Sequence, residues 1–520
     1  MSRQELFEQL QASQPFDVAV VGGGATGLGI ALDAALRGLR VVLLESHDFA
    51  KGTSSRATKL VHGGVRYLAQ GNVSLVREAL HERAVLLHNA PHLAQPLPFV
   101  MPSYRWWETA FYGIGLMLYD LLAGKSGVGR TEFLSRNEVL KRLPQAQQKG
   151  LRGGVQYWDG QFDDARLALA LARTAEQQGA LLINYCPVTA LKHDNKRVVG
   201  LQCQDQETGR AFDVQAHCVI NATGVWVDAL REMDGLAIDR QVKAMVAPSQ
   251  GVHLVVDREF LNSDHALLVP STADGRVLFA VPWLGKVILG TTDTPRHDLP
   301  REPQAFESEV EFILQESARY LQRAPTRADV RSVWVGLRPL VKPQDDEGDN
   351  TKGLSREHTV LISRSGLVTV TGGKWTTYRA MAEDVLSQCI KAKLIHTKHA
   401  HSSSQDCSLV GAPKSAAHHV SITQAAGLHL YGSEQAQIQA TAGADHWITP
   451  ELNEAMIRFA AQHEFARTVE DVLARRSRLL FLDARAAMRV APQVADILKS
   501  ETACDPKLED FLQVASHYVL

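Results

Sequence analysis

The sequence has no excess of charge of either sign. Its 520 residues include 55 lysines and arginines and 57 aspartates and glutamates, which gives a formal net charge of −2. Binding to nucleic acid depends largely on cations that neutralise phosphates, and the overall composition provides no such basic field. We therefore predict a protein without a nucleic-acid partner.

Cysteine is also scarce. The six cysteines are Cys186, Cys203, Cys218, Cys389, Cys407 and Cys504. None of them forms a Cys-x-x-Cys pair, the spacing typical of zinc sites and redox-active dithiols. We expect reduced structural thiols, no metal site and a cytosolic compartment.

Long apolar runs are missing as well. The longest extends from Phe111 to Gly124 and is interrupted by Asp120, whereas a spanning helix needs about 20 apolar residues. The first 16 residues lack the basic segment and apolar core of a signal peptide. We expect no membrane-spanning segment, although the chain can still lie on a membrane surface.

The N-terminal part of the chain contains a strand–helix–strand pattern typical of dinucleotide binding. An apolar strand predicted at 16–21 ends in three glycines, a helix follows, and a second strand at 39–44 is closed by Glu45. The glycines let the backbone approach a pyrophosphate at the helix N-terminus, and Glu45 is placed to accept hydrogen bonds from ribose hydroxyls. The candidate cofactor residues of this unit are Gly22, Gly24, Ala25, Thr26, Gly27 and Glu45.

The chain after Glu45 favours FAD over a nicotinamide cofactor. In place of a second helix it contains a segment, 52–68, that is rich in small hydroxyl residues and suited to wrap a larger cofactor. Later, two glycines open a helix whose N-terminus would stabilise negative charge on a reduced flavin. The further candidate FAD contacts are Ser54, Ser55, Thr58, Lys59, Leu60, Gly224, Gly372, Gly373 and Lys374.

The order of predicted elements indicates an α/β fold. We expect an FAD-binding, Rossmann-like parallel sheet interleaved with an antiparallel-sheet substrate domain, followed by a C-terminal α-helical domain. The first two share residues 1–395, with substrate parts at about 70–150 and 236–335, and the helical cap covers 405–520. The Ser- and His-rich stretch 399–405 is predicted to be a linker. The strands expected in the substrate domain are 253–257, 266–269, 277–282 and 287–291.

Several longer motifs resemble those of one enzyme family. TSSRATKLVHGGVRYL at 53–68, VGLRPL at 335–340, LSREHTV at 354–360 and GGKWTTYRAMAED at 372–384 are similar to segments of the FAD-dependent glycerol-3-phosphate dehydrogenases. That family lies within the glycine-oxidase and D-amino-acid-oxidase superfamily. The resemblance covers about residues 16–500. The chain lacks an EF-hand loop, since the acidic stretch 345–353 does not have its ligand register, and it lacks the large insertion of the oxygen-using oxidases.

The resemblance implies a reaction and partners. The expected reaction is oxidation of sn-glycerol 3-phosphate to dihydroxyacetone phosphate, with hydride transfer to flavin N5 and electrons passed to a membrane quinone. The expected location is peripheral, on the inner face of the cytoplasmic membrane, and a homodimer is left open. Three alternatives also stay open: an oxygen-using glycerol-3-phosphate oxidase, an amine or amino-acid oxidising flavoenzyme, and a non-catalytic binding protein of the same fold.

The substrate of such an enzyme carries a phosphate with close to two negative charges, so its site needs fixed cations. Basic residues stand among small and apolar neighbours in four of the motifs, and Tyr67 and Thr377 are candidates to orient substrate hydroxyls. The predicted substrate-binding residues are Arg66, Tyr67, Arg338, Arg356, Lys374 and Thr377.

Removing hydride from a secondary alcohol also requires loss of the hydroxyl proton. His62 and His253 are the candidate bases, and Arg338 is a third candidate catalytic residue because a guanidinium can stabilise an alkoxide. The sequence leaves the choice among the three open.

Two stretches combine apolar residues with aromatic or basic ones in the way that membrane-surface segments do. One contains Arg105, Trp106 and Trp107 and continues to Leu118. The other, 474–490, contains five arginines beside Leu479, Leu480 and Phe481. Each is also compatible with an ordinary packed helix.

Overall fold

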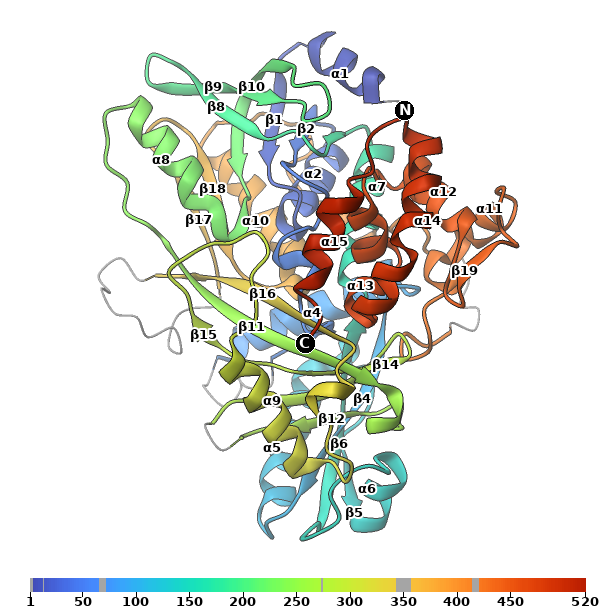
Figure 1. Ribbon diagram of the computed structural model, residues 1–520. Coiled ribbons are helices and arrows are strands. Elements are labelled where there is room, and N and C mark those ends of the chain that lie inside the picture. The colour runs from blue at the N-terminus through green and yellow to red at the C-terminus, as the bar shows by residue number, and fades with distance from the viewer. Residues whose placement is uncertain (1–2, 13, 65–71, 273–274, 343–356, 414–419) are drawn as a thin grey trace.

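The computed structural model describes residues 3–12, 14–64, 72–272, 275–342, 357–413 and 420–520. The candidate residues Arg66, Tyr67 and Arg356 and the acidic stretch 345–353 lie outside these ranges, so their roles stay predictions. Within them the chain forms two large sheets with helices packed on both (Figure 1). The helices are α1 (Arg3–Ala12), α2 (Ala25–Leu36), α4 (Val73–Asn89), α5 (Glu108–Ala123), α6 (Arg136–Arg142), α7 (Asp164–Gln177), α8 (Val227–Ala237), α9 (Glu307–Tyr320), α10 (Tyr378–Lys391), α11 (Gln435–Gln439), α12 (Glu454–His463), α13 (Leu479–Leu482), α14 (Ala484–Thr502) and α15 (Leu508–Ser516).

The first sheet has the strand order β17-β18-β10-β1-β2-β7. Its centre is parallel, because β1 pairs in parallel with β2 and β10, while β8, β9 and β10 form an antiparallel extension. Both faces of β1 are covered: Val18 and Val20 lie in one apolar cluster with residues of α2, and Ala19 and Val21 lie in another with residues of α1. The predicted Rossmann-like sheet is confirmed. Its strands are β1 (Phe16–Val21), β2 (Val41–Leu44), β7 (Leu181–Ile183), β8 (Val188–Asp194), β9 (Arg197–Gln204), β10 (Ala211–Asn221), β17 (His358–Ile362) and β18 (Val368–Gly372).

The second sheet has the order β15-β11-β14-β13-β12-β4-β6-β3, with β16 paired to β11 and β5 to β6. All its pairings are antiparallel except that of β12 with β4. A separate apolar core under this sheet includes Val252, Leu254 and Ile313. The predicted antiparallel sheet is confirmed, and the domain boundaries remain a prediction. Its strands are β3 (Leu60–Val61), β4 (Ala94–Ser103), β5 (Glu132–Ser135), β6 (Gly153–Phe162), β11 (Val246–Asp257), β12 (Ala266–Val269), β13 (Leu278–Trp283), β14 (Lys286–Gly290), β15 (Thr294–Pro295) and β16 (Ser332–Val341).

Residues 420–520 form a C-terminal helical region, drawn in orange and red in Figure 1. It contains α11 to α15, a one-and-a-half-turn π-helix (Asp471–Arg476) and a short hairpin of β19 (Trp447–Thr449) and β20 (Leu452–Asn453). The region packs on β16, where Ser332 Oγ donates to the carbonyl of Leu480 (2.8 Å). The predicted helical tail is confirmed.

The first three arginines of the basic stretch 474–490 are buried, while Arg485 and Arg489 are exposed. Arg475, Arg476 and Arg478 are at most 2% exposed, and Leu480 and Phe481 are equally buried. These arginines pair with buried carboxylates. The possibility that this stretch contacts lipid through them is therefore wrong.

The predicted linker, 399–405, is an irregular but anchored segment. The guanidinium of Arg37 donates to the carbonyl of Ala400 (2.6 Å), and the amide of Asn89 donates to the carbonyl of Gln405 (3.0 Å). These hydrogen bonds therefore tie the stretch to the C-terminal ends of α2 and α4.

Candidate functional site

A large cavity opens at the carboxyl ends of the parallel strands, where ligands bind in open α/β sheets. Five segments that are distant in sequence line it, within 21–26, 44–47, 50–54, 222–226 and 370–375. They follow or end β1, β2, β10 and β18, so the topology of the sheet brings them together.

The glycine turn after β1 is shaped by close backbone contacts. Gly22 has a φ of +108°, and a Cβ there would lie 2.6 Å from the carbonyl oxygen of Ala222. A Cβ on Gly27 would collide with the carbonyl oxygen of Gly22. Both positions therefore require glycine, and the N-terminus of α2 can point into the cavity.

The first turn of α2 has no capping side chain of its own. Gly24 is the N-cap, and the amide of Ala25 donates to Ser54 Oγ (2.9 Å) from the neighbouring loop. The amides of a helix N-terminus and its dipole favour a bound phosphate. Because Gly24, Ala25 and Thr26 line the cavity, this end of α2 fits the pyrophosphate of a dinucleotide.

Glu45 lines the same cavity and is held in one orientation. Its Oε2 accepts from the amide of Gly23 (2.7 Å), and its Oε1 accepts from the amide of His47 (2.8 Å) and from Ser46 Oγ (3.0 Å). A carboxylate has about four lone-pair positions, so these three bonds leave capacity for a ribose hydroxyl. Binding of a ribose hydroxyl by Glu45 stays a prediction.

The opposite side of the cavity is formed by the turn between β18 and α10. Gly372 and Gly373 both adopt positive φ, at +82° and +73°. Trp375 Nε1 donates to the carbonyl of Ser54 (2.8 Å), which joins this turn to the loop after β2. Together with the glycine cradle and the fixed carboxylate, this arrangement fits FAD; that Gly372 to Lys374 hold the flavin end stays a prediction.

Ten of the predicted cofactor residues line the cavity. They are Gly22, Gly24, Ala25, Thr26, Glu45, Ser54, Gly224, Gly372, Gly373 and Lys374. Gly27 lies beneath the glycine turn, and Ser55, Thr58, Lys59 and Leu60 continue the loop beyond the lining. Direct contacts of all fifteen with FAD stay predictions.

The side chain of Lys59 is fully buried and paired. Its ammonium donates to both oxygens of Asp164 (2.7 and 2.9 Å) and to the carbonyl of Ser55 (2.7 Å), and it lies 4.5 Å from the ring centre of Trp334. Burial, only partly opposed by Asp164, lowers its pKa to about 7. The Lys59 side chain thus fixes the chain between Ser55 and Leu60 against Asp164, the first residue of α7.

Arg338 lies on β16 beside the cavity. Its neighbour Pro339 lines the cavity, and Thr53 Oγ1 donates to the carbonyl of Leu337 (2.6 Å). The guanidinium is 25% exposed and pairs with Asp293 (3.3 Å). Gly251, on the adjacent strand, leaves room for it, because a Cβ there would meet the guanidinium carbon at 2.8 Å. The structure thus presents a fixed, accessible cation next to the cofactor cavity.

Glu309 of α9 holds the loop that contacts Arg338. It is 4% exposed, and its carboxylate accepts from Thr292 Oγ1 (2.9 Å) and Thr294 Oγ1 (2.6 Å). Arg338 in turn donates to the carbonyl of Thr292 (3.0 Å). No local pattern marks Glu309 in the sequence, because its partners lie 15 and 17 positions away.

His253 lies on the same face of the second sheet as Arg338, since Arg338 pairs with Ser249 and His253 follows four residues later on the same strand. Its ring stacks on Trp334 with centroids 4.0 Å apart, and Nε2 is 3.0 Å from Thr58 Oγ1. Burial first, and then Arg338 and Lys59, lower the pKa of His253 well below 6.5. The ring is therefore neutral at physiological pH.

His62 follows β3, and its backbone contacts the turn between β18 and α10. Its backbone amide donates to Thr376 Oγ1 (3.2 Å), two residues after Lys374. The candidate Thr377 is buried, and its amide donates to the carbonyl of Lys374 (3.1 Å). The structure therefore brings His62, Lys374 and Thr377 together, with His253 and Arg338 on the adjacent sheet.

Some lining residues were missed from the sequence. Arg301 lies 3.9 Å from the ring centre of Trp226, and both line the cavity. His47, Lys51 and Trp375 line it too. Arg301 lies in an irregular loop of the second sheet region, so no local pattern marks it. Trp375 stands inside the motif quoted at 372–384, and its position there was the available signal.

Comparison with known proteins places this geometry in a class. Residues 17–379 match the family model described as FAD dependent oxidoreductase, and residues 375–508 match that of the C-terminal domain of alpha-glycerophosphate oxidase. Glycine oxidase from Geobacillus kaustophilus has the same fold, with a TM-score of 0.53 at 21% identity over 74% of this chain and 96% of that one. The chain belongs to the FAD-dependent oxidoreductases.

The similarity is greater to one branch of that class. The mitochondrial glycerol-3-phosphate dehydrogenase of Bos taurus is 41% identical over 100% of this chain and 75% of its own length. That of Arabidopsis thaliana is 40% identical over 95% and 84%. The structure of glycerol-3-phosphate dehydrogenase from Bacillus halodurans complexed with FAD aligns with a TM-score of 0.78 at 27% identity, covering 100% and 98%. The chain is a member of the FAD-dependent glycerol-3-phosphate dehydrogenase family.

Proposed function

We propose that this chain oxidises sn-glycerol 3-phosphate to dihydroxyacetone phosphate, uses FAD as its cofactor, and passes the electrons to a membrane quinone. The observation that carries the proposal is the 41% identity to a glycerol-3-phosphate dehydrogenase along the whole chain, which includes the cofactor cavity and β16. When bound, FAD supplies the hydride acceptor at N5.

Arg338 binds the phosphate of the substrate in this proposal. Its partly exposed guanidinium stands beside the cavity, and Lys374 supplies a second cation from the flavin side. Arg66 and Arg356, which lie outside the described residues, are proposed to complete the group. A guanidinium fork suits a phosphate because two parallel N–H donors match two of its oxygens.

We assign proton removal to His62 in preference to His253. A general base must take up a proton and become charged, and burial, Arg338 and Lys59 all oppose that charge on His253. His253 instead holds the segment before His62, through its contact with Thr58. His62 contacts the turn between β18 and α10, which in this proposal holds the flavin. A substrate hydroxyl near this turn would face the cofactor.

The proposed membrane contact is the exposed face of α5. Phe111, Ile114 and Leu121 are 65%, 67% and 76% exposed, and their helical spacing puts them on one side of the helix. Trp106, 82% exposed, precedes the helix, and indole rings favour the boundary between headgroups and acyl chains. Figure 1 shows α5 at the end of the molecule formed by the second sheet, away from the C-terminal region.

The partner proposed for this face is a lipid surface rather than a protein. Arg105 and Lys125 are exposed at its two ends, where they can meet anionic headgroups. Within the described ranges no helix is long and apolar enough to cross a membrane. The contact is thus a peripheral one that buries side chains of α5 into the headgroup region.

Two measurements test these points. FAD-loaded protein is mixed with glycerol 3-phosphate and either a soluble quinone analogue or oxygen alone. Turnover with the quinone and little with oxygen supports the dehydrogenase, whereas rapid oxygen consumption supports an oxidase and no turnover with either refutes the proposal.

Flotation with anionic vesicles tests α5: the Phe111→Ser, Leu121→Ser variant stays at the bottom, and undiminished flotation contradicts the contact.

A further inference from the structure

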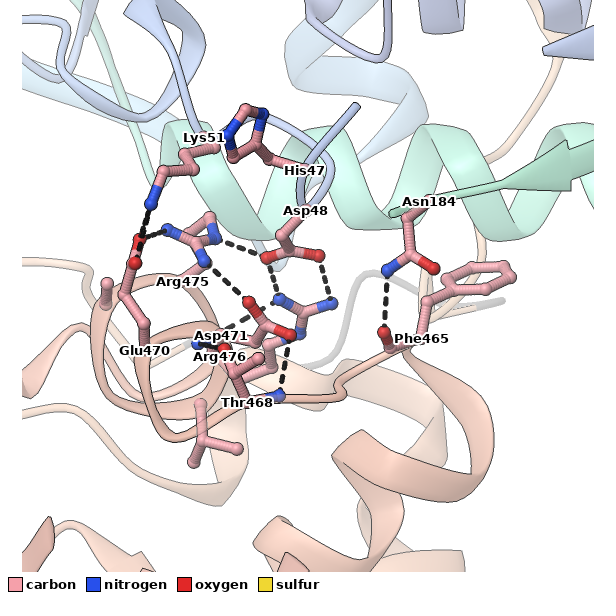
Figure 2. A network of polar contacts seen from close by, with 12 residues as sticks. His47, Asp48, Lys51, Asn184, Phe465, Thr468, Glu470, Asp471, Arg475 and Arg476 are labelled. Atoms are coloured by element: carbon pink, nitrogen blue, oxygen red, sulfur yellow. Dashed lines mark hydrogen bonds and ion pairs between the residues drawn. The ribbon is translucent and has the colours of Figure 1, made fainter. Parts of the chain in front are cut away.

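The loop after β2, residues 47–56, is held by the C-terminal helical region. One side of this loop faces the cofactor cavity, which His47, Lys51 and Ser54 line. Its other side meets the segment 464–478 (Figure 2). The two segments are more than 400 residues apart in sequence, so these contacts add a long-range restraint to the local turn hydrogen bonds of the loop.

Asp48 is the centre of the contact. Its side chain is fully buried, and its carboxylate pairs with both Arg475 and Arg476, with one of the bonds to Arg476 at 3.0 Å (Figure 2). Arg475 also donates to Asp471 (2.8 Å) and to Glu470 (2.8 Å). Buried ion pairs contribute little net stability but become costly when one partner is removed. Each charge in this group has an opposite neighbour, so the loop is tied to a defined position.

Lys51 extends this network to the cavity wall. Its ammonium donates to both oxygens of Glu470 (2.6 and 2.7 Å) and lies 3.4 Å from Glu302. Lys51 lines the cofactor cavity, but Glu470 does not. The side chain of this lining residue is therefore oriented from the C-terminal region.

Apolar contacts also join the loop to the C-terminal helical region. Phe49 is fully buried and packs edge-on against Phe465 (5.2 Å between ring centres). The other side of Phe49 packs closely on the glycine turn, since a Cβ on Gly23 would lie 2.6 Å from the Phe49 ring. The amide of Ala50 donates to the carbonyl of Gly23 (2.9 Å). A shift of the C-terminal region would thus move the turn that faces the pyrophosphate.

The far end of the loop is held from the same region. Arg478 is fully buried and donates to the carbonyl of Ser55 (2.9 Å) and to Asp164 (3.1 Å). The loop between these attachments carries Ser54, whose hydroxyl accepts from the first amide of α2. Both ends of the cofactor loop are therefore attached to the C-terminal helical region.

From these contacts we infer that Glu470 and Arg475 are positioning residues of the FAD site, and that the C-terminal helical region sets FAD affinity by orienting residues 47–56. Glu470 acts through Lys51, and Arg475 acts through Asp48. The region is then a cofactor-retention element as well as a packing partner of β16.

The test is FAD affinity of the full chain, measured by titrating the apoprotein with FAD and following flavin fluorescence. Glu470→Gln removes one charge from a partly exposed position with little change of shape. The matched control is Glu434→Gln, because Glu434 makes a similar bidentate pair with Arg173 (2.6 Å for both bonds), joins the same two parts of the chain and does not line the cofactor cavity. The unfolding midpoint of each apoprotein is recorded alongside.

We expect Glu470→Gln to weaken FAD binding about three- to tenfold, the range for losing one charged contact in a partly buried pair. Glu434→Gln should leave the affinity unchanged while lowering the unfolding midpoint by a similar amount. Equal FAD affinities of the two variants would overturn the inference.

A double variant provides the second measurement. If Glu470 acts through Lys51, adding Glu470→Gln to Lys51→Met weakens FAD binding no further than Lys51→Met alone. Additive losses would contradict the assigned route.

Failure of wild-type protein to oxidise glycerol 3-phosphate while it still binds FAD would refute the proposed reaction and leave this inference standing.

Discussion

Replacing Arg338 by leucine tests the proposed phosphate site most sharply. The Arg338 side chain is one quarter exposed, and its hydrogen bonds to Gln250, Thr291, Thr292 and Asp293 measure 3.0–3.4 Å. A hydrogen bond to a charged group is worth about 1.5–3 kcal/mol. At about 1.4 kcal/mol per factor of ten, kcat/KM for glycerol 3-phosphate should fall about ten- to a hundredfold.

The assay is steady-state turnover with a quinone analogue, with FAD content measured on the same sample. FAD content should remain normal, because Arg338 is absent from the residues that line the cofactor cavity. Discrimination against plain glycerol should shrink, since the lost group contacts only phosphate.

Arg331→Leu is the control: this arginine directly precedes β16 and makes an exposed pair with Asp257 (2.9 Å from Nε), so kcat/KM should not change. An Arg338→Leu enzyme with full FAD and unchanged kcat/KM would refute the reasoning.

Three further predictions follow from the site. Gly22→Ala should abolish FAD retention, because its Cβ would lie 2.6 Å from the Ala222 carbonyl at a φ of +108°; a yellow, stoichiometrically loaded variant would show that the cradle is misplaced. Glu309→Gln should raise KM for glycerol 3-phosphate about tenfold with kcat and FAD content nearly unchanged, since it loosens the loop that holds Arg338; a fall in kcat alone would contradict that role. Burial raises the pKa of Glu470, but Lys51 and Arg475 outweigh it, so the pKa lies below its ordinary value of 4.5. Its stabilising effect is complete above that ordinary value and is lost as the pH falls through the lowered folded-state pKa. The difference in unfolding midpoint between wild type and Glu470→Gln should therefore shrink below about pH 4, and a difference independent of pH would argue against an ionised Glu470.

The parts of the fold that local pattern determines were predictable from sequence. β1, the glycine turn and α2 form one contiguous signal, and β12 begins and ends where its apolar run does. Ten of the predicted FAD residues line the cavity, because the ends of parallel strands meet at one edge of the sheet.

The buried charges were not predictable. A row of arginines at 475–478 has the same local pattern whether it faces solvent or buried acids, and the partner of Arg475 is Asp48, 427 positions away. Lys59 is a similar case, since its partner Asp164 lies 105 positions along the chain. Long-range pairing of charges depends on the tertiary fold, and a single sequence carries no local mark of it.

The proposed reaction is tested most directly by anaerobic reduction of the bound flavin. FAD-loaded protein is titrated with sn-glycerol 3-phosphate while the visible absorbance of the oxidised flavin is recorded, and glycerol serves as the matched substrate without phosphate. The account predicts that glycerol 3-phosphate bleaches the flavin and that glycerol at the same concentration does not. Flavin that stays oxidised with glycerol 3-phosphate would contradict it.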